Sequence, residues 1–129
     1  MKQHEIWLHK ALNDLKSAQR LSEGADPIFD TAIYHTQQCA EKSLKAYLAF
    51  SQQPIQKSHD VAFLVELCCE IDQSFDILTE HAHMLNPYSS AFRYPDVAIE
   101  PDEEDVREAI DSAKRVFEFA RGKIEGTPP

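Results

Sequence analysis

The sequence predicts an all-α fold, an up-and-down bundle of four long helices plus one short helix. Hydrophobic residues make up 43% of the 129-residue chain and charged residues 27%, which is typical of a globular domain. Only three glycines are present, and no segment has the alternating pattern of a strand, so long helices are permitted. The length suits one domain, which we expect to span residues 1–125, with a disordered tail over residues 126–129.

The first two expected helices follow from their apolar spacing and their ends. Apolar residues recur at helical spacing from residue 5 to Leu21, and Gly24 is suited to the left-handed position after a helix. The second helix is expected over residues 27–50, because Asp26 and then Pro27 form a typical helix start. Pro54 follows its end.

The remaining segments are a third helix, a short helix, a loop and a last helix. Ser58 or Asp60 can cap the third helix, and residues 75–85 form the short one. Residues 88–102 contain three aromatic residues and two prolines without a period, so we expect a long loop. The acidic run at 102–105 favours a helix start, and the last helix is expected to fray near Gly122.

Charge and cysteine content exclude several classes of function. Thirteen basic and twenty-two acidic side chains give a net charge of −9, which disfavours general nucleic-acid binding but leaves room for a local basic pocket. Three cysteines without a Cys-x-x-Cys pair indicate buried thiols in a reducing compartment. The chain lacks a signal-peptide core and an apolar run of about 20 residues, so the cytoplasm is the expected location.

No metal site or cofactor is expected. None of the six histidines has the spacing of a metal pair, since His81 and His83 point to different sides of a helix. The acidic run lacks the alternating ligands of a calcium loop, and no glycine-rich phosphate loop occurs.

One face of the second expected helix is unusually polar. Opposite its apolar stripe lie a phenol, an imidazole, an amide, a carboxylate and two ammonium groups, contributed by Tyr34, His35, Gln38, Glu41, Lys42 and Lys45. One interpretation is a solvated face on which Glu41 and Lys45 form an i, i+4 pair. The other is a binding surface.

The long loop also has two interpretations. Arg93 stands between Phe92 and Tyr94, so its planar guanidinium can stack on a base or hold a phosphate. Alternatively, Arg93 and Asp96 form an ion pair that fixes the loop over the bundle.

Taken together, these motifs resemble the HEPN family, named for higher eukaryote and prokaryote nucleotide-binding domains. The resemblance covers nearly the whole chain and is carried by Gln-x-x-Glu-Lys-x-x-Lys from Gln38 to Lys45, by His59, and by Arg-Tyr-Pro-Asp from Arg93 to Asp96. It implies a bundle that pairs into a homodimer, with the polar helix face and the loop arginine near a shared cleft. It also implies a possible partner, a separate minimal nucleotidyltransferase in a toxin-antitoxin type pair.

Other members of this family are metal-independent ribonucleases, which use an arginine and a histidine separated by four to six residues. After Arg93 that window holds Ala98, Ile99 and Glu100, so the histidine is missing. Metal-free cleavage needs a proton acceptor for the 2′-hydroxyl, and only His35 or His59, brought in through the fold, is a candidate.

The leading hypothesis is therefore a non-catalytic nucleotide- or partner-binding module. Lys42, Lys45 and Arg93 would contact phosphate or acidic groups, and Tyr94 would offer an aromatic face. The full expected site is Gln38, Glu41, Lys42, Lys45, His59, Arg93, Tyr94 and Asp96. The alternatives are a ribonuclease toxin with an altered site and a purely structural dimeric scaffold.

A homodimer is expected for a second reason. The sequence contains large side chains that one bundle core does not need, namely Trp7, Tyr34, Phe92 and Phe119. Self-association through a two-fold interface can cover such residues.

Overall fold

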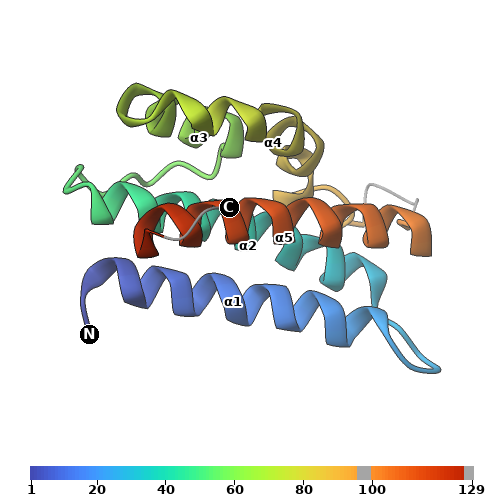
Figure 1. The fold of residues 1–129 in the computed structure, drawn as a ribbon. Coiled ribbons are helices and arrows are strands. Elements are labelled where there is room, and N and C mark those ends of the chain that lie inside the picture. The colour runs from blue at the N-terminus through green and yellow to red at the C-terminus, as the bar shows by residue number, and fades with distance from the viewer. Residues whose placement is uncertain (96–99, 127–129) are drawn as a thin grey trace.

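The computed structural model describes residues 1–95 and 100–126, and within them it contains helices and no strand. The helices are α1 (Gln3–Ser22), α2 (Phe29–Phe50), α3 (Val61–Ile71), α4 (Thr79–Leu85) and α5 (Glu103–Glu125) (Figure 1). Two 3₁₀ helices, η1 (Gln73–Leu78) and η2 (Asn86–Ser89), precede and follow α4. The all-α prediction, with four longer helices and one short one, is confirmed.

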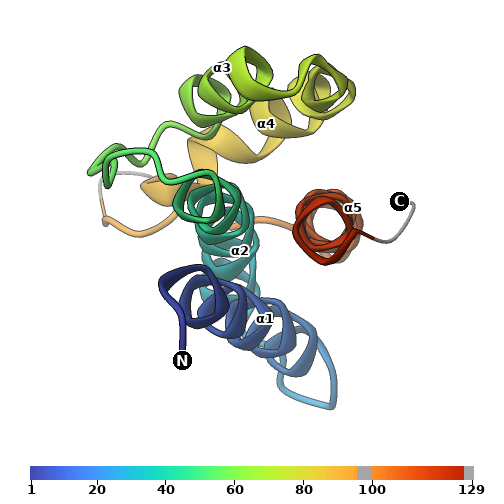
Figure 2. The same cartoon turned by 60° about the vertical axis from the view of Figure 1, so that its left-hand side comes forward.

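The central element is α2. It packs against α1 on one side, α5 on another and the α3–α4 pair on a third, as the view nearly along the bundle shows (Figure 2). More than half of its 22 residues are buried, among them Ile33, Leu44 and Leu48. Because α2 is covered from three sides, the polar side chains on it have to find partners within the protein.

Two of the three cysteines belong to the core, as predicted. Cys39 of α2 and Cys68 of α3 are fully buried, whereas Cys69 is only half-buried. Burial raises the pKa of the Cys39 and Cys68 thiols to about 12, so both remain protonated at neutral pH.

The predicted helix ends are correct in part. Asp60 caps α3, since its carboxylate accepts from the backbone N–H of Phe63 at 3.1 Å. The second helix begins two residues later than predicted, at Phe29, because the backbone of Ile28 is not helical (φ −116°, ψ 84°). The N–H of Ile28 donates to the carbonyl of Leu21 at 2.8 Å, and Asp26 lies in the turn between them.

The last helix also extends beyond its prediction. Gly122 is buried inside α5, which ends at Glu125 and is followed by Gly126 in the left-handed conformation, with φ of 74°. The fraying expected at Gly122 is therefore wrong. The predicted disordered tail falls mostly on residues 127–129, outside the described residues.

The four aromatic residues predicted to be surplus to one core have partners within the chain. Trp7 packs on Lys45, Tyr34 on Arg93, Phe92 on Tyr88 and Phe119 on Phe75. These side chains are nevertheless only partly buried, and the homodimer stays a prediction. The exposed large apolar side chains are others, chiefly Ile28, Phe50, Ile55, Ile71 and Ile77. Among the described residues, no helix is long and apolar enough to cross a membrane.

Asp72 connects η1 to the C-terminal part of α5. Its carboxylate accepts from the hydroxyl and the backbone N–H of Ser74, at 2.6 and 3.0 Å, and from Lys123 Nζ at 2.9 Å. These bonds, the Ser74 hydroxyl first, lower the pKa of Asp72 from 3.8 to about 2. The charged form is thus favoured in the folded state.

We predict that Asp72 makes the free energy of unfolding depend on pH in acid. Because the folded pKa is depressed, its contribution is present above the unfolded value of 3.8 and is lost as the pH falls toward 2. Asp72→Asn keeps an acceptor for the Ser74 N–H but removes the charge, so it should flatten the stability profile between pH 4 and pH 2. Urea unfolding at several pH values measures this. Asp26→Asn, an exposed acid between α1 and α2, is the control, and an equal flattening in it would contradict the assignment.

Candidate functional site

The polar face of α2 holds a buried carboxylate, Glu41, which is only 3% exposed. Its Oε2 accepts from Lys45 Nζ at 3.0 Å, and its Oε1 accepts from His59 Nδ1 at 3.0 Å. The Nε2 atoms of Gln37 and Gln38 lie 3.3 and 3.4 Å from the same Oε1. A carboxylate with this many donors fixes the position of the groups around it.

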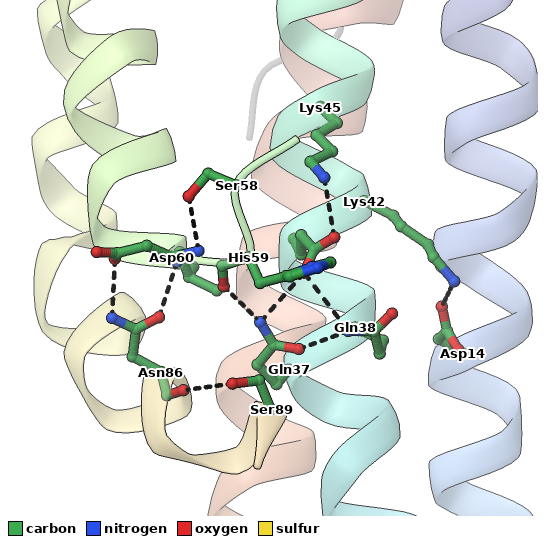
Figure 3. A network of polar contacts seen from close by, with 12 residues as sticks. Asp14, Gln37, Gln38, Lys42, Lys45, Ser58, His59, Asp60, Asn86 and Ser89 are labelled. Carbon is green, nitrogen blue, oxygen red and sulfur yellow. Dashed lines mark hydrogen bonds and ion pairs between the residues drawn. The ribbon is translucent and has the colours of Figure 1, made fainter. Parts of the chain in front are cut away.

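Gln37 joins this Glu41 cluster to the segment between α2 and α3. Its Nε2 donates to the carbonyl of His59 at 2.9 Å, and its Oε1 accepts from Gln38 at 2.8 Å (Figure 3). Gln37 is fully buried, and the sequence analysis did not single it out. Its i, i+4 spacing to Glu41 was the available signal.

Lys45 is also buried, with 7% exposure, and its ammonium lies 5.6 Å from the centre of the Trp7 ring. Glu41 and Lys45 therefore form a buried pair within the bundle. The interpretation of this face as solvated was wrong for both residues, because the segment after α2 and the start of α1 cover it.

A second set of polar contacts extends from α3 toward the long loop. Asn86 Nδ2 donates to Asp60 Oδ1 at 2.8 Å, while Asn86 Oδ1 accepts from the N–H of Val61 at 2.8 Å (Figure 3). The amide of Asn86 and the N–H of Phe63 lower the pKa of Asp60. Ser89 Oγ donates to the Asn86 carbonyl at 3.4 Å, so the start of the loop is tied to the α3 N-terminus.

Asp14 of α1 forms a third polar contact with α2. It is 7% exposed, and its two oxygens lie 2.7 Å from His35 Nδ1 and 2.7 Å from Lys42 Nζ. Asp14 was not predicted as a site residue. A signal existed, since residue 14 falls on the same helical stripe as the buried Ala11, Leu15 and Ala18.

A groove of about 280 Å³ opens between the first turns of α2 and the loop that follows η2. It is lined by Asp30, Thr31, Tyr34, His35, Phe92 and Arg93. The Arg93 guanidinium lies 4.1 Å from the centre of the Tyr34 ring, and its Nη1 donates to the Ser89 carbonyl at 3.4 Å. This stacking leaves other N–H groups of the guanidinium edge available to an anion.

The backbone before Arg93 has an unusual conformation. Phe92 has φ of 67°, a left-handed geometry that costs roughly 1–2 kcal/mol for a residue with a side chain. The ring of Phe92 stacks on Tyr88 at 6.2 Å, which helps to hold this turn. The turn brings Arg93 back over α2.

The structure thus separates the predicted site residues into groups. Gln38, Glu41, Lys45 and His59 belong to the Glu41 cluster, Lys42 pairs with Asp14, and Arg93 lines the groove. Tyr94 is 58% exposed and does not line the groove, where Tyr34 and Phe92 supply the aromatic rings instead. Asp96 lies outside the described residues, so its pairing with Arg93 stays a prediction.

The expectation that Lys42, Lys45 and Arg93 form one positive spot was wrong. Each lysine is bound to a buried carboxylate of its own, Asp14 or Glu41, and Arg93 is the one of the three that lines the groove. A helical projection places the two lysines on one face but does not show which acids face them from α1 or from α2 itself.

Residues 1–95 and 100–126 contain no group of three or more histidine, cysteine or acidic side chains arranged to hold a metal ion. His81 Nδ1 instead lies 2.9 Å from the buried hydroxyl of Ser112, a contact between α4 and α5. The groove next to Arg93 combines a cation, a histidine and two aromatic rings. A second hollow, lined by His81, Arg115 and Phe119, has the same kinds of group with one ring.

A family model and a solved structure name the same family for this chain. The HEPN domain matches residues 4–123. The sequence of an archaeal HEPN homologue of known crystal structure is 28% identical to this chain. The two structures match with a TM-score of 0.75, covering 96% of this chain and 99% of the homologue. A Thermus thermophilus protein of known crystal structure is 27% identical in sequence. Its structure matches with a TM-score of 0.77, covering 95% of this chain and 99% of the other. No curated protein gives a significant match.

We predict that the Glu41 cluster stabilises the fold. Glu41→Gln keeps the shape of the side chain but leaves the Lys45 ammonium buried without its charge partner, which should cost about 3–5 kcal/mol in the free energy of unfolding. Adding Lys45→Met removes the unpaired charge and should recover most of that loss. Denaturant unfolding of the single and double variants measures both effects.

The control is Glu70→Gln, an exposed acid on α3, which should change stability by less than about 0.5 kcal/mol. A Glu41→Gln protein as stable as the wild type would show that the cluster is not structural.

Proposed function

Because the chain belongs to the HEPN domain family, we propose that it is a binding module whose groove beside Arg93 holds the phosphate of a nucleotide. The observation that carries this proposal is the Arg93 guanidinium stacked 4.1 Å from the Tyr34 ring on the wall of the groove. A stacked guanidinium keeps one orientation, and its N–H edge matches the oxygens of a phosphate.

The size and charge of the molecule support a small ligand. The groove, at about 280 Å³, is near the lower end of the range of small-molecule sites, which is roughly 300–1,000 Å³. The chain carries a net charge of −9, so an anion is repelled at long range and has to be held by short, directional bonds. A mononucleotide meets both conditions better than a long nucleic acid.

We also propose that the chain forms a homodimer and acts with a separate minimal nucleotidyltransferase in a toxin-antitoxin type pair. Support for this comes from the family. The homodimer is also supported by exposed apolar side chains such as Phe50, Ile55 and Ile77, which a dimer interface could cover. In such a complex an acidic partner surface would compete for Arg93.

A second candidate is a ribonuclease with an altered site. It is favoured by one observation, that His35 lines the same groove as Arg93 and is held at Nδ1 by Asp14. A histidine oriented in this way is a possible proton acceptor beside a phosphate-binding arginine. The absence of the family's nuclease histidine after Arg93 weighs against this candidate.

We predict that Arg93→Lys weakens binding of AMP about tenfold, because a lysine cannot stack or offer a planar pair of donors. The melting temperature should stay nearly unchanged, since the side chain is exposed. Isothermal titration calorimetry and a thermal melt measure the two effects separately.

Arg121→Lys is the matched control. Arg121 is also an exposed arginine next to an aromatic ring, 5.1 Å from the centre of the Phe117 ring, but it does not line the groove. If Arg93→Lys unfolds the protein without a separate binding defect, Arg93 is a structural anchor of its loop and the scaffold alternative gains support.

We predict no ribonuclease activity. Purified protein incubated with single-stranded and structured RNA in the presence of a chelator should leave both intact, as followed on a denaturing gel. Cleavage that disappears in both Arg93→Ala and His35→Gln would establish the second candidate.

A further inference from the structure

We propose that His35, held by the buried Asp14, is the second phosphate contact of the groove, and that the groove therefore selects a terminal phosphate over the internal phosphate of a nucleic-acid chain. This inference rests on the proposed function, and it adds two residues and a ligand class to it. It is carried by the position of the imidazole between a buried carboxylate and the wall of the groove.

The first step is the orientation of the ring. His35 Nδ1 lies 2.7 Å from Asp14 Oδ1, and the Asp14 side chain is only 9% exposed. Because Nδ1 is bound to Asp14, Nε2 is the ring nitrogen that this bond leaves for a ligand. His35 lines the groove and its side chain is 27% exposed, so a ligand in the groove can reach the ring.

The second step is the charge around the ring. The charged and titratable groups around His35 come from three elements. They are Asp14 from α1, Asp30, Tyr34 and Lys42 from α2, and Arg93 from the loop. Asp14 places a negative charge next to Nδ1, and Lys42 brings a positive charge to the same carboxylate. A histidine changes charge in the neutral range, so an incoming anion can determine its state.

Asp30 also lines the groove, and its negative charge opposes the binding of an anion there. Its Oδ1 accepts from the N–H and the hydroxyl of Thr31, at 2.7 and 3.3 Å. These bonds engage one of its two oxygens. Arg93 and His35 are the groups on the groove wall that can carry a positive charge.

The third step concerns the ligand. A terminal phosphate carries about 1.5 to 2 negative charges at pH 7 and three acceptor oxygens, whereas a phosphodiester carries a single charge. Two donors, Arg93 and a protonated His35, match the terminal group. A terminal phosphate also brings one nucleoside to a groove of about 280 Å³, while an internal phosphate brings two.

The proposal predicts that binding of AMP takes up a proton. The phosphate dianion favours the charged imidazole, so a fraction of a proton is captured by His35 as the complex forms. Titration calorimetry at pH 7 in two buffers with different ionisation enthalpies measures this uptake directly. The ligands compared are AMP, adenosine and the dinucleoside monophosphate ApA.

The wild-type protein should bind AMP at least tenfold more tightly than adenosine or ApA. His35→Gln should weaken AMP binding about tenfold and remove most of the proton uptake, leaving ApA binding nearly unchanged. Asp14→Asn should also reduce the proton uptake. Because this substitution removes the charge partner of Lys42 as well, its effects are not specific to His35, and His35→Gln is the decisive variant. His83→Gln, an exposed histidine on α4, is the matched control.

Two results would overturn the inference in different ways. If AMP binding depends on Arg93 while His35→Gln retains both the affinity and the proton uptake, the role of His35 is wrong but the proposed function stands. If the wild-type protein does not bind AMP at all, the proposed function and this inference both fail.

Discussion

A carboxylate inside a helical bundle has to be surrounded by donors, and the position of Glu41 on the central helix imposes this requirement on the rest of the structure. Lys45 satisfies one of its oxygens from the next turn of α2, and His59 satisfies the other from the segment before α3. Gln37 then holds the backbone of that segment. Such a group costs free energy to bury, and it is retained where it specifies one arrangement of the chain.

The same requirement determines where the groove lies. Once His59 is fixed, Asp60 caps α3 and is bridged through Asn86 to the 3₁₀ helix that follows α4. The carbonyl of Ser89 at the end of that helix accepts from Arg93. The arginine on the groove wall is thus connected to the interior of the bundle by hydrogen bonds joined through the backbone of His59–Asp60 and of Ser89, although its own side chain is exposed.

Much of the fold could be predicted from the sequence, because apolar spacing reports which helices exist. The start of α2 could not, since a backbone bond between Ile28 and Leu21 depends on how two helices meet. A helical projection of α2 places Glu41 and Lys45 on the polar side, but it does not show that other segments cover that side. For the site, Arg93 was predicted from its aromatic neighbours, whereas Asp14 became recognisable only when α1 was seen to present it to His35 and Lys42.

The buried cysteines connect this packing to the behaviour of the chain over time. Cys39 and Cys68 come from α2 and α3, and their thiols face the interior in protonated form. An alkylating reagent reaches neither one until the helices separate, so the rate at which they are modified reports how often the bundle opens. The half-buried Cys69, next to Cys68 on α3, provides an internal reference for local motion of that helix alone.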